Sequence, residues 1–192
     1  MAFDNKNFLV LDIETNGIGG FRPPTQTITQ LAFIKFKSDG TLIAQSCDII
    51  KGATAVKSHP SVTISLEQIK NEGIDYKVAI HKLFSNIDSN TILVSHNFDF
   101  DTGLVKNCIK DDNLVFPTNK YICTMKSSIN YCKLPKSGYG SKYPGFKFPS
   151  LIELATKLEI PMDPSKFHDA LYDCEITKEC LVAGLKKKIF TV

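Results

Sequence analysis

Acidic residues interrupt apolar segments of this chain, and their placement restricts the folds it can adopt. The first segment, Phe8 to Ile13, is rich in β-forming residues and runs into the triplet Asp12-Ile13-Glu14. Strand side chains alternate between faces, so Asp12 and Glu14 share the face of Val10 and lie roughly 6.5–7 Å apart. Two such carboxylates resist desolvation unless a cation or a hydrogen-bond donor compensates them. The pair therefore indicates a divalent-cation site, with a solvated strand end or a turn cap as the alternative.

A second acid lies inside a predicted helix, at about residues 98–108. Three, four and seven residues after Asp101 the chain is apolar, whereas the same offsets from Asp99 reach Thr, Gly and Lys. Residues at these offsets share one helix face, so Asp101 is expected to point inward and Asp99 to face solvent. A buried Asp usually has a partner. Asp101 is thus a candidate metal ligand, with a hydrogen-bonded core acid as the alternative.

The third acid, Asp173, belongs to a predicted final helix over about residues 169–186. It lies on the apolar stripe of that helix, whereas Glu175 and Glu179 fall on a face with lysines. His168 precedes the helix by one residue, and histidine is the side chain that titrates near neutral pH. His168 is a candidate catalytic base, with an ordinary surface or core histidine as the alternative.

The order of elements predicts an α/β fold. Strand patterns over 8–13, 28–36 and 42–50 suggest a three-stranded meander, with a turn at Ser38-Asp39-Gly40. Helices and strands then alternate, and Ser150 with Glu153 forms a capping box before another helix. This order predicts one three-layer α/β domain over residues 1–192, built on a mixed sheet. The remaining predicted elements are helices at 76–87 and near 125–131 and strands at 91–95 and 121–123.

Composition excludes several classes of protein. The six cysteines form no Cys-x-x-Cys pair and no signal peptide precedes the first strand, which predicts free thiols and a cytoplasmic protein. No apolar run approaches the ~18 residues of a membrane span, so no membrane partner is expected. The net charge of +3 permits a polyanionic partner without requiring one.

A Gly/Pro-rich loop over residues 133–149 combines cations with aromatic rings. Such a mixture suits a single nucleic-acid strand, because phosphates attract cations and every base offers a face for stacking. Lys142 and Tyr143 are therefore predicted to contact substrate. The alternative is a surface loop whose aromatic side chains anchor it to the domain. The loop contains Lys133, Lys136, Lys142, Lys147, Tyr139, Tyr143, Phe146 and Phe148.

Three motifs in order resemble those of a known family. They are LVLDIETNG at 9–17, HNFDFD at 96–101 and HDALYD at 168–173. The chain resembles the DEDDh branch of the DnaQ-like exonucleases, which includes the proofreading epsilon subunit of DNA polymerase III, RNase T and oligoribonuclease. The resemblance implies a ribonuclease-H-like, three-layer fold with a five-stranded mixed sheet flanked by helices. The family often has Thr-Thr-Gly after the Glu, whereas this chain has Asn16 in the middle position.

The resemblance also implies a role for each motif residue. Asp12 would bridge two divalent cations, Mg²⁺ or Mn²⁺. Glu14 and Asp173 would complete one cation site, Asp101 would support the other, and His168 would be the general base. Carboxylates suit these cations, whereas a zinc site would use more Cys and His. Thr15 is implied to meet the terminal 3′ nucleotide through its backbone, and Asn97 to be structural or adjacent to substrate.

The expected function is a metal-dependent 3′–5′ exonuclease that releases nucleoside 5′-monophosphates from single-stranded nucleic acid, with DNA favoured. Its expected partners are the 3′ ends of single-stranded DNA or RNA, and a DNA polymerase is a candidate partner. The alternatives are an RNA-directed exoribonuclease on the same scaffold, a non-catalytic nucleic-acid-binding module, and a subunit that mainly holds a polymerase. The acids retained in all three motifs argue against the non-catalytic module, since desolvated carboxylates without a ligand are costly.

Overall fold

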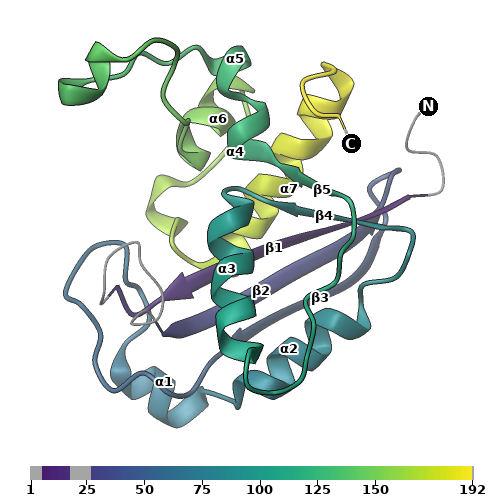
Figure 1. Ribbon diagram of the computed structural model, residues 1–192, viewed down its shortest axis with the longest axis vertical. Coiled ribbons are helices and arrows are strands. Elements are labelled where there is room, and N and C mark those ends of the chain that lie inside the picture. Colours follow the sequence, from purple (N-terminus) through teal and green to yellow (C-terminus); the bar gives the residue numbers. More distant parts are fainter. Residues whose placement is uncertain (1–5, 18–26, 192) are drawn as a thin grey trace.

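A five-stranded mixed sheet forms the centre of the computed structural model, which describes residues 6–17 and 27–191 (Figure 1). The strand order is β3-β2-β1-β4-β5, with β1, β2 and β3 antiparallel and β4 and β5 parallel to β1. The expected fold class and meander are thus confirmed. The strands are β1 (Asn7–Thr15), β2 (Ile28–Lys37), β3 (Leu42–Ile49), β4 (Thr91–Ser95) and β5 (Tyr121–Cys123).

Seven α-helices occur in the described residues, and most agree with the helical spacing of the sequence. The helix expected near 125–131 is divided into two short helices, α4 and α5. The short helix α1 was not predicted from the sequence; Ser65 and Gln68 close a capping box at its start. The helices are α1 (Leu66–Glu72), α2 (Tyr76–Ser85), α3 (Phe98–Ile109), α4 (Thr124–Ser127), α5 (Ile129–Cys132), α6 (Leu151–Lys157) and α7 (Ala170–Lys186).

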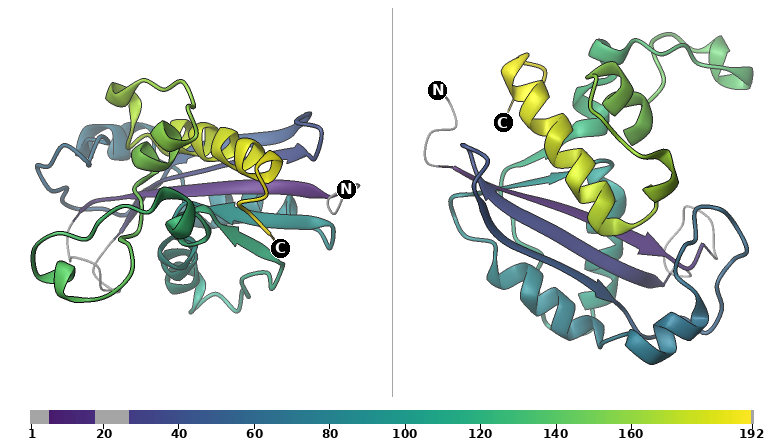
Figure 2. Two further views of the ribbon diagram at one scale, coloured as in Figure 1. Left: turned by 90° about the horizontal axis from the view of Figure 1, so that it is seen from above. Right: turned by 180° about the vertical axis from the view of Figure 1, so that it is seen from behind.

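Alternating side chains of the sheet supply two separate cores. Phe8 and Val10 of β1 face α6 and α7, whereas Leu9 and Leu11 face α2 and α3. Figure 2 shows the helices on opposite sides of the sheet when the molecule is viewed from above. Burial of this kind contributes about 25 cal/mol for each Å² of apolar surface. The two cores fix β1 between α3 and α7, the helices that carry Asp101 and Asp173.

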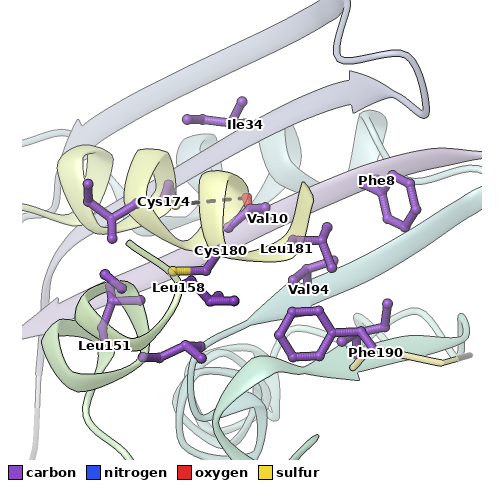
Figure 3. Close-up of a cluster of buried hydrophobic side chains, with 14 of the residues drawn as sticks. Phe8, Val10, Ile34, Val94, Leu151, Leu158, Cys174, Cys180, Leu181 and Phe190 are labelled. Atoms are coloured by element: carbon purple, nitrogen blue, oxygen red, sulfur yellow. Dashed lines mark hydrogen bonds between the residues drawn. The ribbon is translucent and has the colours of Figure 1, made fainter. Parts of the chain in front are cut away.

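Buried thiols belong to the core between the sheet and α7. The Cys174 thiol lies 3.6 Å from the carbonyl oxygen of Ala32 and 3.9 Å from that of Val10, within hydrogen-bonding range for sulfur (Figure 3). Cys180 is also fully buried in this core. All six cysteines are free, as expected.

None of the helices within residues 6–17 and 27–191 combines the length and the apolar character needed to cross a bilayer.

Candidate active site

The first strand delivers two acids to one side of the sheet. Asp12 and Glu14 lie on the face of β1 that carries Phe8 and Val10, as the alternation predicts. The pairing of β1 with β2 shifts register between Glu14 and Thr15, so the strand becomes irregular directly after the acids. The pairing continues beyond this shift, since Thr15 pairs with Ile28 and the N–H of Asn16 donates to the carbonyl of Thr27 (3.0 Å).

The turn after β1 is fixed by the side chain that departs from the family pattern. Asn16 is buried; its amide nitrogen donates to the carbonyl of Ala55 (3.2 Å) and its Oδ1 accepts from the backbone N–H of Thr27 (3.1 Å). Its carbonyl also accepts from the N–H of Lys57 (2.9 Å). Asn16 therefore joins β1 to the 51–65 loop.

The start of α3 separates its two acids as the helical spacing predicts. Asp101 is 3% exposed and accepts a hydrogen bond from the hydroxyl of Ser95, the last residue of β4. Asp99 is exposed and forms an ion pair with Lys126. Asn97 precedes the helix in the left-handed region, with φ 106°, and its side chain makes no capping bond. Of the two acids, Asp101 is the one that enters the site.

The segment before α7 brings a histidine back onto Asp173. His168 has φ 70°, and its backbone N–H donates to Oδ2 of Asp173 (3.3 Å). On the other side, the hydroxyl of Thr63 donates to the His168 carbonyl (2.5 Å). His168 is exposed as a residue, while hydrogen bonds hold its backbone N–H and its carbonyl. Ligand atoms of Glu14, His168 and Asp173 lie within 4.8 Å of one another.

The acids lie close enough to change one another's protonation. Burial first, and then Asp101, Asp173 and Glu14, raise the pKa of Asp12 well above its usual range. Burial, followed by neighbouring carboxylates including Asp173, raises the pKa of Glu14 to about 8. Burial likewise raises the pKa values of Asp101 and Asp173 to about 7. Four carboxyl groups in one place, each disfavoured as an anion, form a site that a cation would stabilise.

One carboxylate oxygen of this group has no partner within the described residues. Oδ1 of Asp173 is buried and has no hydrogen-bond partner among the described residues. No lysine in residues 6–17 or 27–191 forms an ion pair with Asp12, Glu14, Asp101 or Asp173. Hard divalent cations take carboxylate oxygens as ligands and keep several waters. The donor set therefore fits Mg²⁺ or Mn²⁺.

A further polar residue at this site was not predicted from the sequence. Gln30 of β2 pairs with Glu14 across the sheet and is 4% exposed. Its Nε2 donates to Oδ2 of Asp169 (3.2 Å), and its Oε1 accepts from the N–H of Ala170 (2.8 Å). The available signal was a polar side chain inside the apolar run ITQLAFIKF.

Comparison with known proteins agrees with this geometry. Residues 9–181 match the family model for the RNase T exonucleases. The chain belongs to this exonuclease family. The three motifs of the sequence agree with this membership and with the resemblance to DnaQ-like exonucleases.

The similar curated proteins are much longer than this chain. It is 24% identical to the DNA polymerase III PolC-type of Thermotoga petrophila over 98% of the chain and 13% of that protein. It is 26% identical to the DNA polymerase III PolC-type of Listeria monocytogenes over 92% of the chain and 11% of that protein. The chain thus spans about an eighth of the length of the Thermotoga relative.

Solved structures share the fold at low sequence identity. The cell-death related nuclease CRN-4 superposes with a TM-score of 0.71 at 14% identity, covering 95% of this chain and 64% of that one. The nuclease domain of 3′hExo, described as a DEDDh family member bound to rAMP, also gives 0.71 at 14% identity, over 95% and 93%. Exonuclease I gives 0.70 at 20% identity, over 96% and 42%. These likenesses confirm the ribonuclease-H-like architecture.

Proposed function

We propose that this exonuclease removes nucleoside 5′-monophosphates one at a time from the 3′ end of single-stranded nucleic acid, with DNA favoured, using two divalent cations, Mg²⁺ or Mn²⁺. The observation that carries the proposal is the convergence of four acids from β1, α3 and α7 beside His168. The preference for DNA is supported by the DNA polymerases among its similar proteins.

Asp12, Glu14, Asp101 and Asp173 would hold the two cations, as the motifs imply, with Asp12 at the centre of the group. When bound, such cations neutralise the charge that develops on the phosphoryl oxygens and stabilise the leaving 3′ oxygen.

His168 would accept the proton of the attacking water. Partial burial, and then the neighbouring His59, lower the pKa of His168 below its usual 6.5. The imidazole is therefore neutral at neutral pH and has a free lone pair for a proton, as a general base needs. The hydrogen bonds of its backbone to Asp173 and Thr63 would fix where the ring can reach.

Two further residues would meet the terminal nucleotide. Thr15 follows Glu14 at the irregular end of β1, where its backbone would face the terminal sugar. Asn97 precedes α3, and its side chain is free of a capping role, so its amide is a candidate for a substrate contact. Association with a DNA polymerase is a second part of the proposal, supported by the PolC-type relatives.

The test uses 5′-labelled single-stranded DNA and the matching RNA with Mg²⁺, Mn²⁺ or EDTA. A ladder that shortens from the 3′ end and is abolished by EDTA would support the exonuclease, and the faster polymer would give the preferred sugar. Asp101→Ala should lose activity, whereas Asp99→Ala, on the exposed face of the same helical turn, should retain it. Degradation of RNA alone would make the protein an exoribonuclease. Retention of intact strands on a filter without cleavage under any metal would mean a binding module and overturn the proposal.

A further inference from the structure

The 133–149 loop projects from the body of the molecule. Figures 1 and 2 show it extending beyond α5 and α6, at the top left of Figure 1, while the arrowhead of β1 lies lower on the same left-hand side of that figure. Since β1 delivers Asp12 and Glu14 at that end, the loop projects on the side of the candidate active site.

The aromatic side chains of this loop do not anchor it. Tyr139 is 70% exposed, Tyr143 54% and Phe148 55%, and Phe146 is exposed as well. A ring that fixed a loop to the domain would be buried in contact with the core. The anchoring interpretation of these aromatic residues is therefore wrong.

The loop is nevertheless ordered by contacts of its own. Gly138–Lys142 form a 3₁₀ turn, on which the rings of Tyr139 and Tyr143 meet edge to face with centroids 5.7 Å apart. Nζ of Lys142 lies 5.0 Å from the centroid of the Tyr139 ring. Nζ of Lys136 donates to the carbonyl of Pro144 (2.7 Å). The exposed rings and cations are thus held in place before any ligand arrives, which reduces the entropy lost on binding.

The last residue of the loop, Pro149, contacts His96, which precedes Asn97 and Asp101 in the chain. Nε2 of His96 lies 3.0 Å from the carbonyl oxygen of Pro149, and its Nδ1 lies 3.0 Å from the hydroxyl of Thr124. His96 opens the motif that contains Asn97 and Asp101. The base of the loop therefore has a fixed position relative to the catalytic acids.

The charge of the loop suits a polyanion. Residues 133–149 contain four lysines and no acid. One lysine, Lys147, is neutralised by Glu153 (2.6 Å), while Lys142 is exposed and its ammonium lies over the Tyr139 ring. Unpaired bases stack on aromatic rings without regard to sequence, and duplex bases have no free face for such contacts.

We propose that the 133–149 loop is a binding site for the unpaired strand upstream of the scissile bond, with bases stacked on Tyr139 and Tyr143 and a phosphate held by Lys142. This inference rests on the proposed function for the position of the 3′ end. Binding at the loop would make single-stranded polymers of several nucleotides better substrates than mononucleotide esters, because the esters are too short to reach the loop.

The test compares two substrates in the full chain: a single-stranded 15-mer and the p-nitrophenyl ester of thymidine 5′-monophosphate. In the double variant Tyr139→Ala/Tyr143→Ala, the ratio of kcat/KM for the 15-mer to that for the ester should fall about tenfold or more, because stacking on an aromatic ring is lost for each base. Lys142→Ala should lower the ratio less and weaken its salt dependence. Lys187 is an exposed cation directly after α7, and Lys187→Ala should leave the ratio unchanged.

Binding of a fluorescent 15-mer in EDTA keeps the inference testable if the chain cleaves neither substrate. Absence of all cleavage would count against the proposed function, whereas the loop is judged by the anisotropy titration. Weaker binding of the double variant supports the loop site. An unchanged dissociation constant together with an unchanged kcat/KM ratio would overturn it.

Discussion

The side chain of Gln30 holds the start of α7 through Asp169, a residue 139 positions away in the sequence. One end of the amide donates to Oδ2 of Asp169 and the other accepts from the N–H of Ala170. Gln30 is also the partner of Glu14 in the sheet. A single buried amide thus fixes the distance between the acids of β1 and the segment that carries His168 and Asp173.

Replacing this amide should impair catalysis more than substrate binding. Gln30→Leu would leave the Ala170 N–H and one Asp169 oxygen without their partner, a loss of about 1–3 kcal/mol in the free energy of unfolding. Because misplacement of catalytic groups is costly, kcat should fall at least about tenfold. KM for a single strand should change little. Gln45→Leu, on the exposed side of β3, is the matched control. A lower melting temperature with unchanged kcat would show that Gln30 is only structural.

Removal of His168 should separate catalysis from cation binding. We expect His168→Ala to lower kcat by about 10²- to 10⁴-fold, the usual contribution of a general base. Binding of Mn²⁺, measured by calorimetry, should persist because the four carboxylates remain. His81→Ala, an exposed histidine on α2, is the control. Loss of Mn²⁺ binding in His168→Ala would instead assign the imidazole as a metal ligand.

The sequence predicted which acidic side chains face inward, because burial leaves a periodic pattern of apolar residues along the chain. The offsets of Asp101 and Asp173 within apolar stripes identified them as inward-facing, and both are buried. The two-residue period of β1 similarly placed Asp12 and Glu14 on one face. Local periodicity is sufficient for such predictions, since it depends only on neighbours in the same element.

Features made by distant segments were not predictable in this way. The Gln30–Asp169 contact and the Thr63–His168 hydrogen bond join residues more than 100 positions apart. The helix α1 has only seven residues; its capping box of Ser65 and Gln68 was the local signal in the sequence, and a bridge between Ile50 and Ile74 follows the helix. Tertiary contacts of this kind override local propensity.

Two helical glycines should respond oppositely to the same substitution. A Cβ on Gly184 would lie 2.1 Å from Cε2 of Phe190, whereas a Cβ on Gly103 would meet no atom within 4 Å. Phe190 is buried in the core beside α7, so its ring has little room to move. Gly103→Ala should stabilise the protein by about 0.5–1 kcal/mol through helix propensity. Gly184→Ala should destabilise it by about 1–3 kcal/mol through overpacking. Urea unfolding would measure both, and equal shifts would show that the Phe190 ring does not decide the outcome.

The acidic cluster should make the metal-free protein less stable as pH rises from about 6.5 to 8. A carboxyl group whose folded pKa exceeds its unfolded value stabilises the fold below the unfolded pKa, and this contribution is lost as pH rises through the folded pKa. For Asp101 and Asp173 that folded value is about 7, and for Glu14 about 8. His96, whose pKa burial lowers to about 4, has the opposite effect, but only below its unfolded pKa of about 6.5. Between about pH 6.5 and 8 the acids therefore dominate.

In EDTA, the melting temperature should fall across that window, and Mn²⁺ should restore it most strongly at pH 8, because cation binding requires deprotonated carboxylates. Asp12→Asn removes the acid on which the other three converge. This variant should melt higher than the parent in EDTA at pH 8, yet gain little from Mn²⁺ and lose its activity. Asp99→Asn, whose carboxylate is exposed and paired with Lys126, should keep the parent's pH slope. A melting temperature that stays flat from pH 6.5 to 8 in EDTA would mean that the four carboxylates do not repel one another in the folded protein, and that cation binding is not coupled to their deprotonation.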